Sequence, residues 1–160
     1  MIDGSNIRAH QHAAGAAGGQ EHQALGRSRG GFGTKNHAKV DAFGMPLDFV
    51  LTGGEAHELT VAKELLGTDI SGYLLADRAY DSNDLRDFLA GRGTEAVIPG
   101  KKNRIIPIEH DRHIYKERNF VERFFNRLKQ FRRIATRYEK LAVTFMGAIV
   151  MAGILMWLKF

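Results

Sequence analysis

Residues 115–131 read YKERNFVERFFNRLKQF, and apolar residues recur every three or four positions along them. This spacing predicts an amphipathic helix. Because an α-helix turns about 100° per residue, four polar residues fall within an arc of about 60°, opposite the apolar stripe. The polar residues are Tyr115, Arg118, Glu122 and Lys129, and the stripe is Phe120, Val121, Phe124, Leu128 and Phe131. We therefore expect a buried stripe, with an acid flanked by two bases and a phenol on the other face.

The segments on either side of this helix predict alternating strands and helices. Strands are expected at 1–9, 35–43, 47–52, 73–76 and 96–98, with a turn at Gly44-Met45-Pro46. Helices are expected at 58–66, 82–89 with Ser82 as N-cap, 115–135 and 140–159. Residues 13–33 are rich in Gly, Ala, Gln and Ser, which favours a mobile loop. This order indicates a mixed α/β fold in a single domain, residues 1–160.

The C-terminal segment Leu141 to Leu158 contains no charged residue. Such a segment is either a short transmembrane helix or a helix buried all round in a globular core. We expect the buried helix, because the segment is at the short limit for spanning a membrane. Gly147 and Gly153 would then allow close packing, and the side chains expected to be buried are Phe145, Ile149, Ile154, Leu155 and Trp157.

Composition favours a polyanionic partner. The chain has 23 Lys and Arg against 18 Asp and Glu, a net charge of +5. Basic residues concentrate near the long helix, at Arg118, Arg123, Arg127, Lys129, Arg132, Arg133, Arg137 and Lys140. Aromatic residues lie among them, which is typical of a nucleic-acid-facing surface. The absence of cysteine excludes disulfides and zinc–thiolate sites, and it fits a reducing cytoplasm.

Two further patterns in the sequence are weaker indications of a binding site. His10 and His12 would share one face of a strand and could bind a soft metal, but contact with DNA or a neighbouring strand is the favoured interpretation. The glycine-rich stretch Gly30 to Lys35 lacks the G-x-x-x-x-G-K-[ST] pattern of a nucleotide-binding loop.

Several phrases carry a family resemblance. They are Y-x2-R-x3-E-x6-K from Tyr115 to Lys129, ADRAYD at 76–81, DGSNIRAHQH at 3–12, GTKNH at 33–37 and RFFNRLK at 123–129. With these phrases the sequence resembles bacterial insertion-sequence transposases of the DDE type that carry the Y-R-E-K signature. The resemblance runs along nearly the whole chain, and it implies an RNase H-like mixed sheet flanked by helices, as in the retroviral-integrase-like superfamily.

The resemblance also implies a D-D-E triad at Asp3, Asp77 and Glu122, acting only as ligands of Mg²⁺ or Mn²⁺, with two ions in the site. Such ions prefer carboxylate oxygens and can support both cleavage and joining of phosphodiesters. Taken singly, Asp3 could begin a turn, Asp77 could pair with Arg78, and Glu122 could pair with Arg118. Asp81 and Asp84 are interpreted as a loop acid and a first-turn acid.

The implied function is cleavage of insertion-sequence ends and strand transfer into target DNA, by a homo-oligomer on double-stranded DNA in the bacterial cytoplasm and nucleoid. The expected DNA-binding residues are Tyr115, Arg118, Lys129, Arg123, Arg127, Arg132 and Arg133. Relatives carry an N-terminal DNA-binding region that is absent here, which suggests a truncated copy or one product of a split reading frame. The alternatives are a simple Mg²⁺ nuclease, a non-catalytic DNA-binding remnant, and a small membrane-anchored protein.

Overall fold

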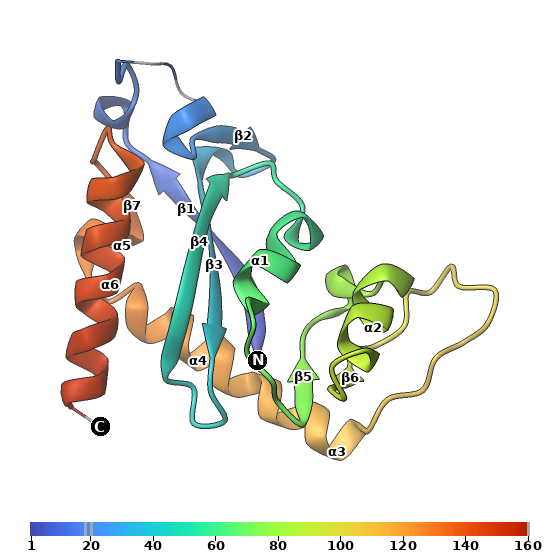
Figure 1. Ribbon diagram of the computed structural model, residues 1–160. Coiled ribbons are helices and arrows are strands. Elements are labelled where there is room, and N and C mark those ends of the chain that lie inside the picture. The colour runs from blue at the N-terminus through green and yellow to red at the C-terminus, as the bar shows by residue number, and fades with distance from the viewer. Residues whose placement is uncertain (18, 20, 160) are drawn as a thin grey trace.

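A computed structural model describes residues 1–17, 19 and 21–159 of the chain (Figure 1). The strands are β1 (Ile2–Ala9), β2 (Gly26–Ser28), β3 (Gly31–Val40), β4 (Pro46–Gly53), β5 (Tyr73–Leu75), β6 (Glu95–Val97) and β7 (Thr136–Arg137). The α-helices are α1 (Ala62–Leu66), α2 (Asn83–Ala90), α3 (Arg112–Tyr115), α4 (Asn119–Leu128), α5 (Arg132–Ala135) and α6 (Ala142–Leu158). Short 3₁₀ helices are η1 (Gln11–Ala13), η2 (Glu21–Gln23), η3 (Glu58–Val61), η4 (Arg78–Tyr80) and η5 (Lys116–Arg118).

The main sheet mixes antiparallel and parallel pairing around β1. β1 pairs with β3 in antiparallel register, Asp3 opposite Ala38, and its last residues pair with β7 in parallel. β3 also pairs with β4 and, at its start, with β2, while β5 and β6 form a second, parallel pair. This curled mixed sheet with flanking helices confirms the α/β fold class and is consistent with an RNase H-like fold.

The two faces of β3 are buried for different reasons. Ala38 and Val40 belong to an apolar core formed with α4, α5 and α6. Lys35 and Lys39, on the other face, are also buried, and each is paired with an acid: Lys35 with Glu58 at 2.9 Å and Lys39 with Asp69 at 2.7 Å. A buried ammonium group requires such a partner, because desolvation penalises an unpaired charge.

A second apolar core joins β1 to the β5–β6 pair. Ile2 packs there with Ala62, Leu65, Leu66, Leu74, Ala76, Tyr80, Leu85, Leu89 and Ile98. Ser82 caps α2 as expected, since its Oγ accepts a hydrogen bond of 3.1 Å from the Leu85 amide. The two cores therefore lie on either side of the segment of β1 that begins with Ile2 and Asp3.

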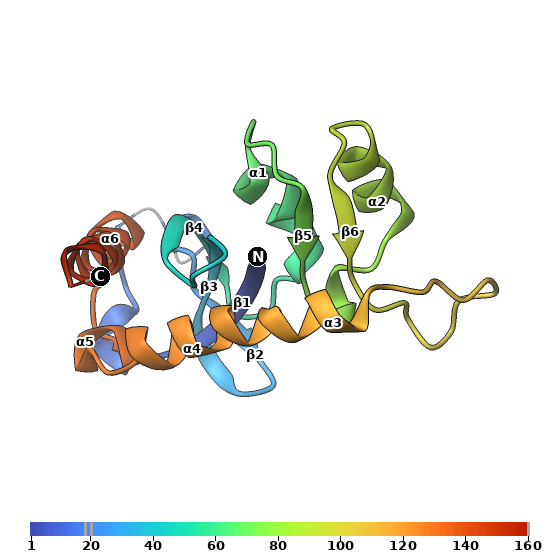
Figure 2. The same ribbon diagram turned by 90° about the horizontal axis from the view of Figure 1, so that it is seen from below.

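The long helix expected at 115–135 is interrupted. α3, η5 and α4 follow one another as a nearly straight rod beneath the sheet, which Figure 2 shows from below. The rod ends at Lys129, and a separate α5 leads into β7. Val121, Phe124 and Leu128 are buried as expected, but Phe131 is exposed because it lies beyond the end of α4.

The C-terminal helix α6 is present, but the expectation that it is buried all round is wrong. Its buried residues Phe145, Ile149, Ala152, Gly153 and Met156 form one face. Val143, Val150, Met151, Ile154, Leu155, Trp157 and Leu158 are exposed. The physical reason is that only one side of α6 meets the sheet and α4. No helix in the described part of the chain is both long enough and apolar enough to cross a membrane.

The glycines of α6 differ from one another. A Cβ atom at Gly153 would lie 3.4 Å from ring atoms of Pro46 and Phe49, so this position lets α6 approach β4 closely. Nothing lies within 4 Å of a Cβ at Gly147, so the expected packing role of that glycine is wrong.

The segment 13–33 is not a structureless loop. It contains η2, β2 and the beginning of β3, and Leu25 within it is buried. Its residues 18 and 20 lie outside the described residues. β1 ends at Ala9, so His10 and His12 do not share a strand face; instead His10 caps η1 and stacks on the Tyr138 ring, with centroids 4.8 Å apart.

Candidate active site

Asp3 lies near the start of β1 and turns its carboxylate toward the η5–α4 rod. Its Oδ1 atom accepts a hydrogen bond of 2.8 Å from the Gly4 amide, and Oδ2 lies 2.9 Å from Nη1 of Arg118. Burial raises the pKa of Asp3, and Asp77 raises it further, whereas the Gly4 amide and Arg118 act in the opposite direction; the net shift is upward. Asp3 therefore carries a carboxylate that is partly desolvated and held by one cation.

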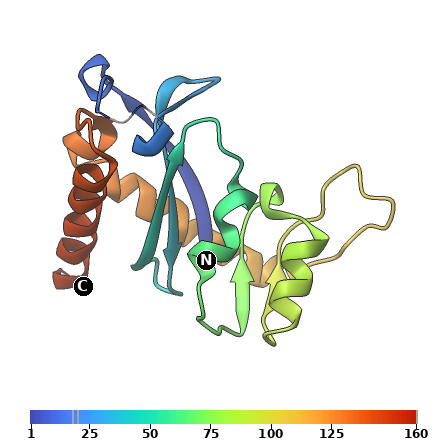
Figure 3. The same ribbon diagram turned by 45° about the horizontal axis from the view of Figure 1, so that its top comes forward.

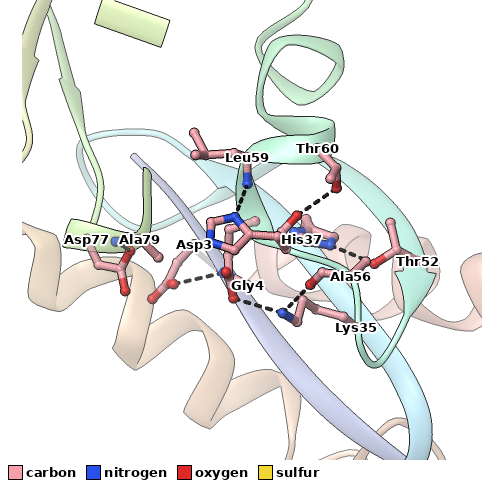
Figure 4. A network of polar contacts seen from close by, with 12 residues as sticks. Asp3, Gly4, Lys35, His37, Thr52, Ala56, Leu59, Thr60, Asp77 and Ala79 are labelled. Atoms are coloured by element: carbon pink, nitrogen blue, oxygen red, sulfur yellow. Dashed lines mark hydrogen bonds and ion pairs between the residues drawn. The ribbon is translucent and has the colours of Figure 1, made fainter. Parts of the chain in front are cut away.

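Asp77 follows β5 by two residues and caps η4. Its Oδ1 atom accepts a hydrogen bond of 2.8 Å from the Ala79 amide. The carboxylates of Asp77 and Asp3 point into the same space (Figure 4), and the charge of Asp77 raises the pKa of Asp3. Two acids separated widely in the sequence are thus close enough in the fold to repel each other.

Glu122 is the third acid, and it lies in the first turn of α4. Arg118, one turn earlier, donates from Nη2 to Glu122 Oε1 and from Nη1 to Asp3 Oδ2. Burial acts to lower the pKa of Arg118, but nearby Asp3, Tyr115, Glu122 and Asp77 outweigh it, and the pKa is raised. One guanidinium therefore bridges two of the acids and feels the charge of the third.

The donor chemistry of this group suits a hard divalent cation, because carboxylate oxygens are the ligands that Mg²⁺ and Mn²⁺ prefer. The carboxylates of Asp3 and Glu122 are each placed to form an ion pair with Arg118. Within residues 1–17, 19 and 21–159, no three His, Cys, Asp or Glu side chains are gathered as a metal-binding group. Arg118 supplies the positive charge between the acids instead, so a bound cation would compete with it.

Tyr80 and Glu58 border the same acids, and the sequence analysis did not single them out. The Tyr80 hydroxyl is buried and makes no hydrogen bond. Burial raises the pKa of Tyr80, and the carboxylates of Asp3, Glu58 and Asp77 raise it further. Lys35 could have indicated an acid such as Glu58 from the sequence, because a lysine in the interior of a strand requires a carboxylate partner when it is buried.

Asp81 lies in the loop between η4 and α2, as expected, but it is not a solvated acid. Its carboxylate is fully buried and accepts hydrogen bonds from the Lys101 amide at 2.7 Å and from the guanidinium groups of Arg86 and Arg104. It anchors the loop that projects beyond β6, seen at the right of Figure 3. Asp84, by contrast, is an exposed first-turn acid as expected, and it pairs with Lys63.

The expected DNA-binding residues are partly engaged within the protein. Arg127 donates to the Gly44 carbonyl at 3.4 Å, and Arg133 pairs with Glu139 at 3.0 Å. The guanidinium of Arg123 lies over the Phe120 ring, and Tyr115 packs against His110. Lys129, at the end of the rod, and Arg132, the first residue of α5, are exposed. An open hollow of about 590 Å³ lies between β4 and α6, and Asp3, Asp77 and Glu122 are not among the residues that line it.

The curled mixed sheet with its flanking helices is consistent with an RNase H-like fold. The sequence matches the family described as "Transposase DDE domain" over residues 1–157, and the chain belongs to that family of insertion-sequence transposases.

Two curated relatives are named as putative insertion-sequence transposases. The chain is 40% identical over 129 residues to a putative transposase for insertion sequence element IS6501 of Brucella ovis, covering 79% of this chain and 98% of the relative. It is 34% identical over 122 residues to a putative transposase for insertion sequence element IS402 of Burkholderia cepacia, covering 69% of this chain and 56% of that relative. No solved structure gives a significant match. These findings support DNA transposition as the general function.

Proposed function

We propose that this domain cleaves the ends of its insertion sequence and joins them to target DNA, with Asp3, Asp77 and Glu122 as the essential acids. The observation that carries the proposal is the bridge made by Arg118. One guanidinium contacts Asp3 and Glu122, while Asp77 lies beside Asp3. This contact supports the proposal, because it links the acids of β1 and α4 beside the acid that caps η4.

The three carboxylates would hold Mg²⁺ or Mn²⁺, in a two-ion site by family resemblance. When bound, such ions lower the barrier by activating the attacking oxygen and stabilising the charge on the leaving oxygen. Asp3 and Asp77 are held in place by the Gly4 and Ala79 amides, so their orientation is set before any ligand arrives. A cation held by these acids would compete with Arg118, whose guanidinium could then bind a DNA phosphate in bidentate fashion.

The reaction needs no covalent bond between protein and DNA, because each step breaks one bond to phosphorus for each bond that it forms. In end cleavage the oxygen of water bonds to phosphorus and the bond to the 3′ oxygen breaks, which releases a 3′-hydroxyl. In strand transfer that hydroxyl bonds to a target phosphorus and one target phosphodiester bond breaks. Exposed basic residues such as Lys129 and Arg132 would hold both duplexes by contacts to phosphates. Such contacts contribute affinity but little recognition of the base sequence.

The proposal is tested with the chain expressed together with any companion reading frame of its element. A labelled insertion-sequence end is incubated with Mg²⁺, and nicking is followed on a denaturing gel. Asp77→Asn and Glu122→Gln should each abolish cleavage while the variants keep their circular dichroism spectra. Asp84→Asn, an exposed acid in α2, is the matched control and should cleave as the wild type does. Normal cleavage by Glu122→Gln overturns the assignment, and DNA binding without any cleavage by the wild type would favour a non-catalytic remnant.

A further inference from the structure

Gly4, the residue after Asp3, is packed tightly against side chains from β3 and η3. A Cβ atom at this position would lie 3.3 Å from His37 Nδ1 and 3.4 Å from Glu58 Cγ. Glu58 and His37 are therefore direct neighbours of the strand segment that carries Asp3. Figure 4 shows His37 beside Gly4, in the same view as Asp3 and Asp77.

Two buried polar atoms in this region have no hydrogen-bond partner. Within the described part of the chain, the unpartnered buried side-chain atoms are Tyr80 Oη, His37 Nδ1 and both polar atoms of the Asn36 amide. Tyr80 is 0% exposed, its backbone amide donates to the Asp77 carbonyl at 3.1 Å, and its side chain packs in the same core as Ile2, the neighbour of Asp3. Burial raises the pKa of Tyr80, and the carboxylates of Asp3, Glu58 and Asp77 raise it further. A buried hydroxyl without a partner is costly, so its position beside three acids indicates a ligand or a water that completes it.

The free atom of His37 is an acceptor. Thr52 Oγ1 donates to the Gly53 carbonyl at 3.2 Å, so it accepts the hydrogen bond of 2.9 Å from His37 Nε2. The proton of the neutral ring is then on Nε2, and Nδ1 carries a lone pair. Burial lowers the pKa of His37 to about 4, with the Lys35 charge acting in the same direction, so the ring is neutral near pH 7.

Glu58 is also available to a ligand in this region. Its ion pair with Lys35 uses the Oε1 atom, at 2.9 Å, and a carboxylate has a second oxygen and several lone pairs. The segment around Asp3 thus has an acid, a hydroxyl and a ring nitrogen as neighbours, and all three can accept hydrogen bonds. Hydrated divalent cations present the matching groups, because Mg²⁺ keeps several waters that donate hydrogen bonds.

We propose that Tyr80 and Glu58 form an outer layer of the acidic centre and hydrogen-bond the hydration shell of a divalent cation at Asp3 and Asp77. This inference rests on the proposed function, since it takes the acids as the cation site. Tyr80 and Glu58 are positioning residues here: they act on the water around the cation and not on DNA. Groups in this position typically change metal affinity by about 10-fold to 100-fold.

Tyr80→Phe separates this role from a structural one. Because the hydroxyl is unpartnered in the absence of metal, its removal should leave the melting temperature of the metal-free protein unchanged or higher. Mn²⁺ affinity, measured by titration calorimetry with Mn²⁺ alone, should fall by about 10-fold. Tyr73→Phe, at an exposed tyrosine of β5, is the matched control and should bind Mn²⁺ as the wild type does.

Glu58→Gln and Asp77→Asn complete the experiment. Glu58→Gln should weaken Mn²⁺ binding by a similar factor, whereas Glu64→Gln, an exposed acid in α1, should not. Asp77→Asn should abolish binding. If Asp77→Asn binds Mn²⁺ normally, the proposed cation site itself is wrong. If Asp77→Asn loses binding but Tyr80→Phe and Glu58→Gln keep wild-type affinity, only the outer layer is overturned.

Discussion

Arg118 and Asp3 are 115 positions apart in the chain, yet Nη1 of Arg118 lies 2.9 Å from Oδ2 of Asp3. This ion pair joins the helical rod to the first strand at the place where Glu122 and Asp77 also lie. Arg118 thus supplies a positive charge between Asp3 and Glu122. The sequence predicts that Arg118 contacts phosphate. In the structure its guanidinium also neutralises acids that would otherwise repel each other.

Removal of Arg118 should weaken the metal-free protein and strengthen its response to metal. Arg118→Ala leaves Asp3 without its cation, which should lower the free energy of unfolding by about 1–3 kcal/mol at pH 7. Mn²⁺ should then raise the melting temperature more in the variant than in the wild type, because no guanidinium competes for the acids. Thermal unfolding with and without Mn²⁺ measures both effects. Arg112→Ala in α3 serves as control, and equal Mn²⁺ shifts in the variant and the wild type would contradict the competition.

Asp81 should dominate the acid sensitivity of the fold. Burial alone would raise the pKa of Asp81, but hydrogen bonds from Arg104, the Lys101 amide and Arg86 outweigh it and hold the pKa well below its usual range. A carboxyl with a depressed folded-state pKa contributes stability above its unfolded value of about 3.9, and this contribution is lost as the pH falls below that value.

Asp81→Asn should therefore cost about 1–3 kcal/mol at pH 7, because it removes the buried acid that pairs with two partly exposed guanidinium groups. The variant should also lose part of the decline in stability between pH 5 and pH 2. Urea unfolding across this range is the measurement. Asp84→Asn should change neither quantity, since that acid is exposed, and a wild-type acid profile in Asp81→Asn would refute the prediction.

DNA affinity should depend on the exposed basic residues Lys129, at the end of the rod, and Arg132, at the start of α5. Lys129→Ala and Arg132→Ala should each reduce the slope of log K against log salt concentration by about one unit, as expected for one lost phosphate contact. Fluorescence anisotropy with duplex DNA at several salt concentrations gives the slope. Lys63→Ala, a basic residue in α1 paired with Asp84, should leave it unchanged. If the slopes of Lys129→Ala and Arg132→Ala equal that of the wild type, DNA binds to another surface.

The two faces of α6 should respond differently to truncation. Ile149→Ala should destabilise the protein by about 2–5 kcal/mol, because Ile149 is 0% exposed and its removal leaves a cavity. Met151→Ala, at a residue 60% exposed on the same helix, should stay within about 0.5 kcal/mol of the wild type. Urea unfolding compares the two variants. Equal losses would mean that the outer face of α6 is covered in solution.

Local signals in the sequence predicted most of the elements. The cap at Ser82, the turn before Pro46 and the apolar spacing of Val121, Phe124 and Leu128 each act over a few residues, so they can be recognised without the fold. The family phrases likewise placed Asp3, Asp77 and Glu122 in one group, and the structure brings these acids around Arg118. Their catalytic role stays a prediction.

Long-range packing decided the rest. No local pattern showed that the rod ends at Lys129, because the break depends on the short β7 pairing with the end of β1. Hydropathy could not distinguish the one buried face of α6, since every residue from Leu141 to Leu158 is uncharged and burial depends on what lies alongside. The burial of Asp81 and the unpartnered hydroxyl of Tyr80 also arise from contacts between distant segments. Residue types and their spacing therefore determined which groups were available, whereas only the tertiary structure decided which of them lose their water and face one another.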